Sequence, residues 1–248
     1  PHGNDVCVLT HNFRSHNGIL TAANGLVKLM LEHFKETMDT LAQERGVFDG
    51  LPPLLTPDTD TDSLCGENGV LFNLVATKHR RAVFGANSVI LVRDQMAKKE
   101  IPKIFDKALQ LTTLEAKGLE FDNVLIWNFF SDAEGAQKKK NPNVEWRVLE
   151  KMWIREQGDA SSQIRQQGGS DETFDPAKHG ALCKELKDLY VMITRARKRV
   201  VFFDSNIEKR KHAFNVLVRR GMCRNATTDE VQAHRQEYEW PKATSDCR

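Results

Sequence analysis

Two short segments carry side chains suited to holding a phosphate group. Residues 115–121 read Glu-Ala-Lys-Gly-Leu-Glu-Phe, so a Lys-Gly turn is followed at once by an acid and an aromatic residue. Residues 190–197 read Tyr-Val-Met-Ile-Thr-Arg-Ala-Arg, an apolar segment that delivers Arg195 and Arg197 at one place. A glycine turn can present backbone N–H groups to an anion, and a guanidinium binds phosphate oxygens in a bidentate manner. Together the two segments predict a phosphate site.

A third segment, Asn12-Phe-Arg-Ser15, directly follows a short β-rich run at 6–10. Ligands of doubly wound sheets lie outside the carboxyl ends of strands, so we expect Arg14 to reach such a ligand. An Arg at this position would add another guanidinium group to the predicted phosphate site.

Each segment also has a plain structural interpretation, which stays open at this point. Arg14 would form a salt bridge at the surface, and Glu115 and Glu120 would be solvated charges. Arg195 and Arg197 would complement the dipole at the C-terminus of a helix.

The elements that must position these segments alternate between strands and helices. Apolar residues recur every three or four positions over 19–34, which predicts an amphipathic helix capped by Ser15 or Asn17. Residues 88–92 are apolar almost throughout, as in a parallel strand that is covered on both faces. The alternation predicts an α/β fold with a parallel sheet flanked by helices. Strands are predicted at 6–10, 70–76, 88–92, 109–113, 124–130 and 199–204, and further helices at 94–107, 145–155, 181–196 and 206–221.

The pattern also predicts how the chain is divided. One domain is expected over 1–205, with a loop at 46–68 and a loose surface insertion at 131–180 that contains a short helix. Residues 206–248 are expected to form a basic helical tail with a frayed end. The chain opens with Pro1 and no initiator Met, which suggests a piece of a longer protein.

Composition excludes several classes of protein. The net charge is only +2, from 36 bases and 34 acids, so contact with a polyanion must come from local clusters. Five cysteines without a CxxC pair, and eight histidines without an HExxH spacing, predict reduced intracellular thiols and no metal site. Nucleus and cytoplasm are not distinguished. Because no apolar run approaches the roughly 18 residues that a membrane span needs, we expect no membrane contact.

Taken together and in this order, the three segments resemble motifs of the second RecA-like motor domain of superfamily 1A helicases of the UvrD/Rep/PcrA type. Residues 12–15 are similar to motif IV of that family, 112–122 to motif V and 190–197 to motif VI. The sequences of 117–124 and 185–191 are most similar to the UvrD-like part of large eukaryotic TPR- and ankyrin-repeat proteins.

The resemblance covers roughly residues 9–204 and implies a RecA-like sheet. It also implies that Arg14 and Arg195 are arginine fingers on the γ-phosphate of ATP, which stabilise charge during phosphoryl transfer. Phe13, in place of the usual Tyr, would stack on adenine. Glu120 would hold the ribose, and Gly118 would shape the turn beside it.

The remaining roles implied by the resemblance concern coupling and partners. Arg197 would help to bind the nucleotide by orienting the residues that contact it. Thr112 and Lys117 would lie near the backbone of single-stranded DNA or RNA. The implied partner is the first RecA-like motor domain of the same longer chain. That domain would carry the phosphate loop and the ligands of Mg²⁺, because no Gly-Lys dipeptide, and hence no GxxxxGK[ST] loop, occurs here.

The sequence therefore predicts the C-terminal half of an ATP-dependent helicase that is inactive by itself. The family often has His where this chain has Leu114, which puts one nucleic-acid or coupling contact in doubt. The alternative is a catalytically decayed helicase-like module that binds nucleic acid or serves as a scaffold. A nucleotide-binding metabolic enzyme is a third interpretation, but no carboxylate pair, catalytic triad or dinucleotide fingerprint supports it.

Overall fold

A computed structural model describes residues 11–37, 43–56, 87–132, 142–156 and 174–227 of the chain. The strands predicted at 6–10 and 70–76 lie outside these residues. So do most of the predicted loop at 46–68 and the end of the predicted tail.

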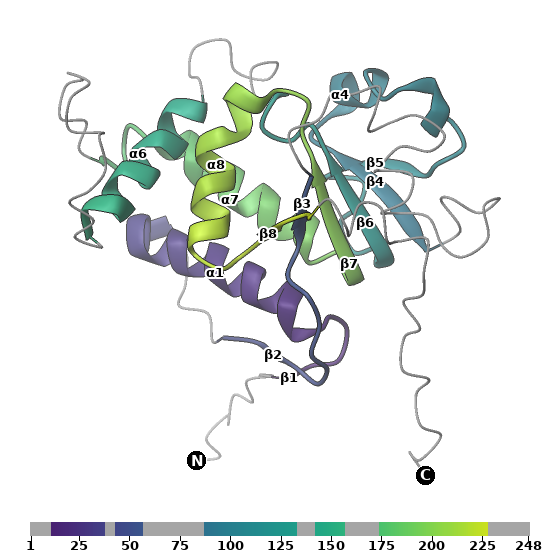
Figure 1. The fold of residues 1–248 in the computed structure, drawn as a ribbon, viewed down its shortest axis with the longest axis horizontal. Coiled ribbons are helices and arrows are strands. Elements are labelled where there is room, and N and C mark those ends of the chain that lie inside the picture. Colours follow the sequence, from purple (N-terminus) through teal and green to yellow (C-terminus); the bar gives the residue numbers. More distant parts are fainter. Residues whose placement is uncertain (1–10, 38–42, 57–86, 133–141, 157–173, 228–248) are drawn as a thin grey trace, which may run out of the picture.

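The centre of the fold is a six-stranded sheet in which each neighbouring pair of strands runs parallel (Figure 1). The strand order is β5-β4-β6-β7-β3-β8. A separate pair of two-residue strands, β1 and β2, lies apart from this sheet. The strands are β1 His11–Asn12, β2 Arg45–Gly46, β3 Leu54–Leu55, β4 Ser88–Val92, β5 Gln110–Thr112, β6 Phe121–Trp127, β7 Ala196–Phe203 and β8 Arg224–Asn225.

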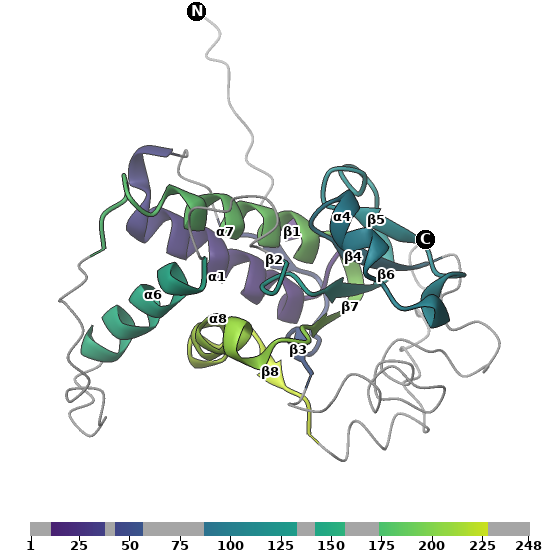
Figure 2. The same ribbon diagram turned by 90° about the horizontal axis from the view of Figure 1, so that it is seen from above.

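Helices cover both faces of the sheet, so the predicted α/β class is confirmed, and the arrangement is consistent with a RecA-like fold. Figure 2 shows α1 beside α7 on one side and α6 beside α8 on the other, with α4 next to β4 and β5. The helices are α1 Asn17–His33, α4 Gln95–Lys99, α6 Pro142–Glu156, α7 Gly180–Ile193 and α8 Ile207–Arg219.

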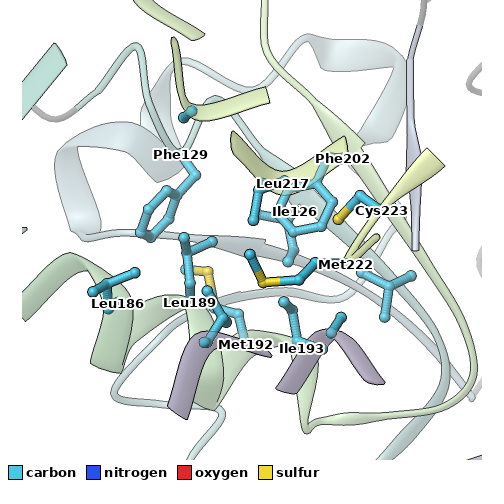
Figure 3. Close-up of a cluster of buried hydrophobic side chains, with 14 of the residues drawn as sticks. Ile126, Phe129, Leu186, Leu189, Met192, Ile193, Phe202, Leu217, Met222 and Cys223 are labelled. Carbon is cyan, nitrogen blue, oxygen red and sulfur yellow. The ribbon is translucent and has the colours of Figure 1, made fainter. Parts of the chain in front are cut away.

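The apolar runs of the central strands are explained by two separate cores. Successive side chains of a strand point to opposite faces, so alternate residues of β4, β6 and β7 enter different cores. In the larger core, Ile126 and Phe202 pack with residues of α7 and α8 such as Leu189 and Leu217 (Figure 3). In the smaller core, Leu125 and its neighbours pack against the segment that contains α4.

Several predicted boundaries were wrong for identifiable reasons. The helix predicted at 94–107 is interrupted: α4 ends at Lys99, and a 3-10 helix follows Pro102, whose ring removes a backbone donor. The strand predicted at 124–130 begins and ends three residues earlier. The helix predicted at 181–196 ends at Ile193, because the chain continues directly into β7 at Ala196.

The start of α1 also differs from the prediction. Its N-cap is His16, whose ring nitrogen accepts a hydrogen bond from the Ile19 N–H at 3.3 Å. Ser15 and Asn17, the predicted caps, bond elsewhere: the Ser15 hydroxyl donates to the Ala196 carbonyl, and Asn17 contacts Asp49 and Gly46.

Two segments predicted to be peripheral belong to the main body. The helix α6 of the insertion buries Trp146, and its Glu145 carboxylate accepts a hydrogen bond from the Leu182 N–H at 2.6 Å. The described part of the predicted tail contributes Phe214 and Leu217 to the larger core and adds the edge strand β8 to the sheet.

Candidate functional site

The amino ends of β6 and β7 bring two of the predicted residues together. Glu120 directly precedes β6, and Arg195 directly precedes β7. These strands are neighbours, with Phe121 opposite Ala196, and the Phe121 N–H donates to the Arg195 carbonyl at 2.9 Å. Parallel pairing thus fixes Glu120 and Arg195 side by side at one edge of the sheet.

Arg14 reaches the same edge from the loop between β1 and α1. Its Nε lies 2.5 Å from Oε1 of Glu120, and the two side chains are 43% and 38% exposed. The Asn12 carboxamide oxygen accepts from the N–H groups of Arg14 and Ser15 at 2.8 and 2.9 Å. This side-chain turn folds the loop back so that Arg14 faces the main sheet.

Arg195 completes a cluster of two cations and one acid. Its Nε donates to the Val191 carbonyl at 3.0 Å, and its other nitrogens reach the Leu119 carbonyl and the Thr194 hydroxyl at 3.3 Å. Burial lowers the pKa of Arg195, and the charge of Arg14 lowers it further, whereas the Glu120 carboxylate raises it. Two positive charges beside one negative charge leave the cluster attractive to an anion.

The Lys-Gly turn has the predicted conformation. Gly118 has φ of 85°, in the left-handed region that favours glycine, and a Cβ there would meet no atom within 4 Å. Thr112 and Glu115 form a reciprocal pair: the Thr112 N–H donates to the Glu115 carboxylate at 2.8 Å, and the Glu115 N–H donates to the Thr112 hydroxyl at 3.2 Å. Backbone hydrogen bonding from Thr112, then hydrogen bonds from Lys98 and Gln95, lower the pKa of Glu115 to about 2.

Thr112 does not lie with the arginines. It ends β5, opposite Val92, level with the carboxyl end of β6, whereas the cluster lies at the amino end of β6. The Thr112 side chain is buried and its hydroxyl is engaged, which argues against direct contact with nucleic acid and gives it a role in holding the turn. Lys117 is exposed on the turn itself.

Arg197 and Phe13 occupy more exposed positions. Arg197 is the second residue of β7, and its Nε lies 4.0 Å from the Asp122 carboxylate, which also binds Lys198 at 2.8 Å. Arg197 therefore shares the Asp122 carboxylate with Lys198. Phe13, next to Arg14, is 78% exposed, so its ring is available to stack on another group.

The predicted location of the site within the sheet was wrong. Arg14 was expected at the carboxyl ends of the strands because a strand precedes it. The strand predicted at 6–10 lies outside the described residues. The strand seen directly before Arg14 is β1, which belongs to the separate two-stranded pair, and the cluster lies at the amino ends of β6 and β7.

Sequence reasoning missed Ser15 and His16, which are both almost fully buried beneath Arg14. Their side chains bond the backbone carbonyls of Ala196 and Lys198 in β7. The only available signal was two polar residues after Arg14, and that pattern does not distinguish a buried contact from an exposed turn.

Two general properties bear on what the site can hold. In the part of the chain that the structure describes, no group of three or more His, Cys, Asp or Glu side chains is placed to hold a metal ion. Within the same residues, no helix has both the length and the apolar character needed to cross a membrane.

Comparison with known proteins shows that the chain resembles part of a human repeat protein. The chain is 38% identical over 232 residues to TPR and ankyrin repeat-containing protein 1 of Homo sapiens. The match covers 90% of this chain and 8% of that much longer protein. It agrees with the resemblance to large eukaryotic TPR- and ankyrin-repeat proteins noted from the motifs. No family model matches the chain.

Among solved structures, the chain is similar to the C-terminal domain of a possible DNA helicase from Lactobacillus plantarum WCFS1. The two share 13% identity with a TM-score of 0.38, over 79% of this chain and 89% of that domain. The architecture described above rests on this chain's own strand pairings.

Proposed function

We propose that this chain is the second motor half of an ATP-dependent nucleic-acid helicase or translocase. ATP would bind between the cluster and a first RecA-like domain of the same longer protein. The observation that carries the proposal is that Arg14 and Arg195, far apart in sequence, lie around Glu120 at one edge of the sheet.

The cluster has the chemistry that phosphoryl transfer requires of such a half. Charge spreads over the γ-phosphate oxygens in the transition state, and preplaced guanidinium groups stabilise that charge. Arg14 pairs with Glu120 in this structure, so a phosphate oxygen would take over part of that pairing. Glu120 would then be free to accept a hydrogen bond from a ribose hydroxyl.

Phe13 and Gly118 complete the proposed nucleotide contacts. The exposed Phe13 ring would stack on adenine, since stacking requires only an accessible aromatic face. The left-handed turn at Gly118 leads the chain to Glu120 without a side chain in the way. Arg197, bound to Asp122, would act from the periphery of the site.

The chain would depend on its partner domain for the rest of the reaction. With no Gly-Lys dipeptide in the sequence, the phosphate loop and the Mg²⁺ ligands would come from the first motor domain. Single-stranded DNA or RNA would contact the exposed Lys117 mainly through phosphates, so binding would weaken as salt rises.

The test is ATP turnover by the longer protein that carries both motor halves. Replacing Arg14 or Arg195 with Ala should lower kcat by on the order of 10³-fold. The matched control is Arg219→Ala, which removes a guanidinium that lies over the Trp153 ring, away from the cluster. Unchanged turnover in both cluster variants, or steady-state hydrolysis by the 248-residue chain alone, would show that the assignment is wrong.

A second candidate is a decayed module that binds nucleic acid or a protein without hydrolysing ATP. Leu114 favours it, because this apolar side chain is 80% exposed where the family often has a histidine. Nucleic-acid binding by the longer protein that is indifferent to ATP analogues would support this candidate over the motor.

A further inference from the structure

We infer that Ser15 and His16 are positioning residues that hold the Arg14 loop against the start of β7 and so set the spacing between the Arg14 and Arg195 guanidinium groups. The geometric part stands by itself. The consequence for catalysis rests on the function proposed above.

Two consecutive side chains form the connection. The Ser15 hydroxyl donates to the Ala196 carbonyl at 2.6 Å, and His16 Nε2 lies 2.9 Å from the Lys198 carbonyl. Both side chains are 3% exposed. Ser15 directly follows Arg14, and Ala196 directly follows Arg195. The two bonds therefore join the segment that carries Arg14 to the segment that carries Arg195.

The reason these carbonyls are available lies in the sheet. In a strand, successive carbonyls point to opposite edges, and the Arg195 carbonyl points toward β6, where it accepts from Phe121. The carbonyls of Ala196 and Lys198 are instead bound by Ser15 and His16, in a stretch where the register between β6 and β7 shifts. The two-residue strand β3 reaches only Val201 and Phe202, so Ser15 and His16 supply the hydrogen bonds that a longer strand would have made.

The His16 ring joins β7 and α1 in one defined tautomer. A carbonyl only accepts, so the nitrogen facing Lys198 must carry the proton. Nδ1 is then the acceptor for the Ile19 N–H and caps α1. Burial lowers the pKa of His16, which favours the same neutral form.

The backbone of the 46–50 loop packs against the His16 ring and the Ser15 backbone. A Cβ added at Gly50 would lie 2.5 Å from the His16 ring, and one at Gly46 would lie 2.8 Å from the Ser15 carbonyl oxygen. The connection is thus enclosed, whereas the Arg14–Glu120 pair that it supports is exposed and only weakly stabilising by itself.

Two substitutions of His16 separate its two bonds. In His16→Asn, the carboxamide oxygen takes the place of Nδ1 as the cap, but the side chain is too short to reach Lys198. In His16→Gln, the longer carboxamide can still donate to Lys198, whereas the cap is lost. Ser15→Ala removes the other bond. Thr21→Ala is the matched control, because it deletes a side-chain bond to Asn17 within α1 without touching β7.

The readout is nuclear magnetic resonance of the 248-residue chain without ligand. The Nε–H signals of Arg14 and Arg195 report the Glu120 and Val191 contacts directly. We expect His16→Asn and Ser15→Ala to shift or broaden the Arg14 signal relative to Arg195. We expect His16→Gln and Thr21→Ala to leave it in place. An Arg14 signal that stays unchanged in both Ser15→Ala and His16→Asn overturns the inference, and the Ser15 variant alone decides if His16→Asn does not fold.

A kinetic measurement separates this inference from the proposed function. In the longer protein, Ser15→Ala and His16→Asn should lower kcat by on the order of 10²-fold with little change in KM, because the charges remain but are misplaced. If Arg14→Ala has no effect on turnover, the proposed function fails while the arginine signals still test the positioning. If Arg14→Ala abolishes turnover but both positioning variants keep full kcat, the positioning role fails.

Discussion

Each end of the parallel sheet has a pair of arginine and glutamate, but one pair is buried and the other is exposed. At the carboxyl end, Arg93 forms an ion pair with Glu185, donates to the Phe129 carbonyl and lies 3.8 Å over the Phe129 ring, with only 12% of its side chain exposed. At the amino end, Arg14 pairs with Glu120 while both side chains remain substantially exposed.

The difference shows which arginine is available to a ligand. Glu185 also accepts from the Trp146 indole at 2.7 Å, so both members of the buried pair are held by further contacts. A buried arginine whose nitrogens are taken by several partners cannot turn to a ligand without leaving a buried charge unpaired, whereas an arginine that keeps exposed donors beside a second cation can exchange its carboxylate for a phosphate. Arg14, and not Arg93, is therefore the arginine free to meet a ligand, and Arg195 is the second cation beside it.

Removing the buried acid should produce the largest effect. Glu185→Ala leaves the Arg93 charge without its carboxylate in the interior, so we expect a loss of about 3–5 kcal/mol in the free energy of unfolding, measured by urea denaturation. Asp188→Ala, one turn later on α7, removes only an exposed pair with Lys184 and is the control. Equal losses for the two variants would contradict the contrast between the ends of the sheet.

The turn that leads to Glu120 should show a smaller effect. Gly118→Ala places a side chain at φ of 85°, and we expect a loss of about 1–2 kcal/mol in unfolding free energy. Gly180→Ala is the control, because it meets open space at the start of α7 without a left-handed backbone. A neutral Gly118→Ala would mean that the turn relaxes readily and does not fix Glu120.

Acid should weaken the amino end through His16. Burial lowers the pKa of this histidine below its ordinary value of 6.5, so the unfolded chain takes up the proton at a higher pH than the folded protein does. The contribution of His16 to stability is thus fully present above pH 6.5 and is lost as the pH falls through its folded pKa. Burial lowers the pKa of His33 in the same direction, so stability curves of wild type and His16→Asn must be compared. Curves that remain parallel between pH 7 and pH 5 would contradict the prediction.

The smallest effect is expected at Glu120. Because this carboxylate competes with phosphate for Arg14, Glu120→Gln should raise the affinity for pyrophosphate by about twofold to fivefold, as followed by the Arg14 Nε–H signal. Stability should change by no more than about 1 kcal/mol. Arg14→Ala is the control that should abolish the gain, and weaker binding by Glu120→Gln would contradict the competition.

Local patterns predicted the parts of the fold that depend on local sequence. The apolar run of β4 and the period of α1 follow directly from which faces are buried. The motif resemblance placed Arg14, Arg195 and Glu120 in one site, and these three side chains do lie together. The left-handed turn at Gly118 was also predictable, since few other residues adopt that conformation.

What the sequence could not predict depends on pairing between distant segments. That β1 lies outside the main sheet decides which end of the sheet Arg14 faces, and no local pattern records it. The helix α6 packs against α8, and its Trp146 bonds Glu185 of α7, so its burial depends on segments that are distant in the sequence. The bonds of Ser15 and His16 depend on how short β3 is, which is visible only once its neighbours are known.

The position of β3 in the sheet has a consequence for how the protein is made. Leu54 pairs with Val201 and Arg224, which lie 147 and 170 residues further along the chain, whereas β4, β5 and β6 pair within one stretch of about forty residues. On the ribosome, β4, β5 and β6 can therefore pair with one another first, while β3 stays unpaired until β7 and β8 have been translated. Closing such long loops slows folding, so the side of the sheet formed by β3 and β8 should be the final part to form.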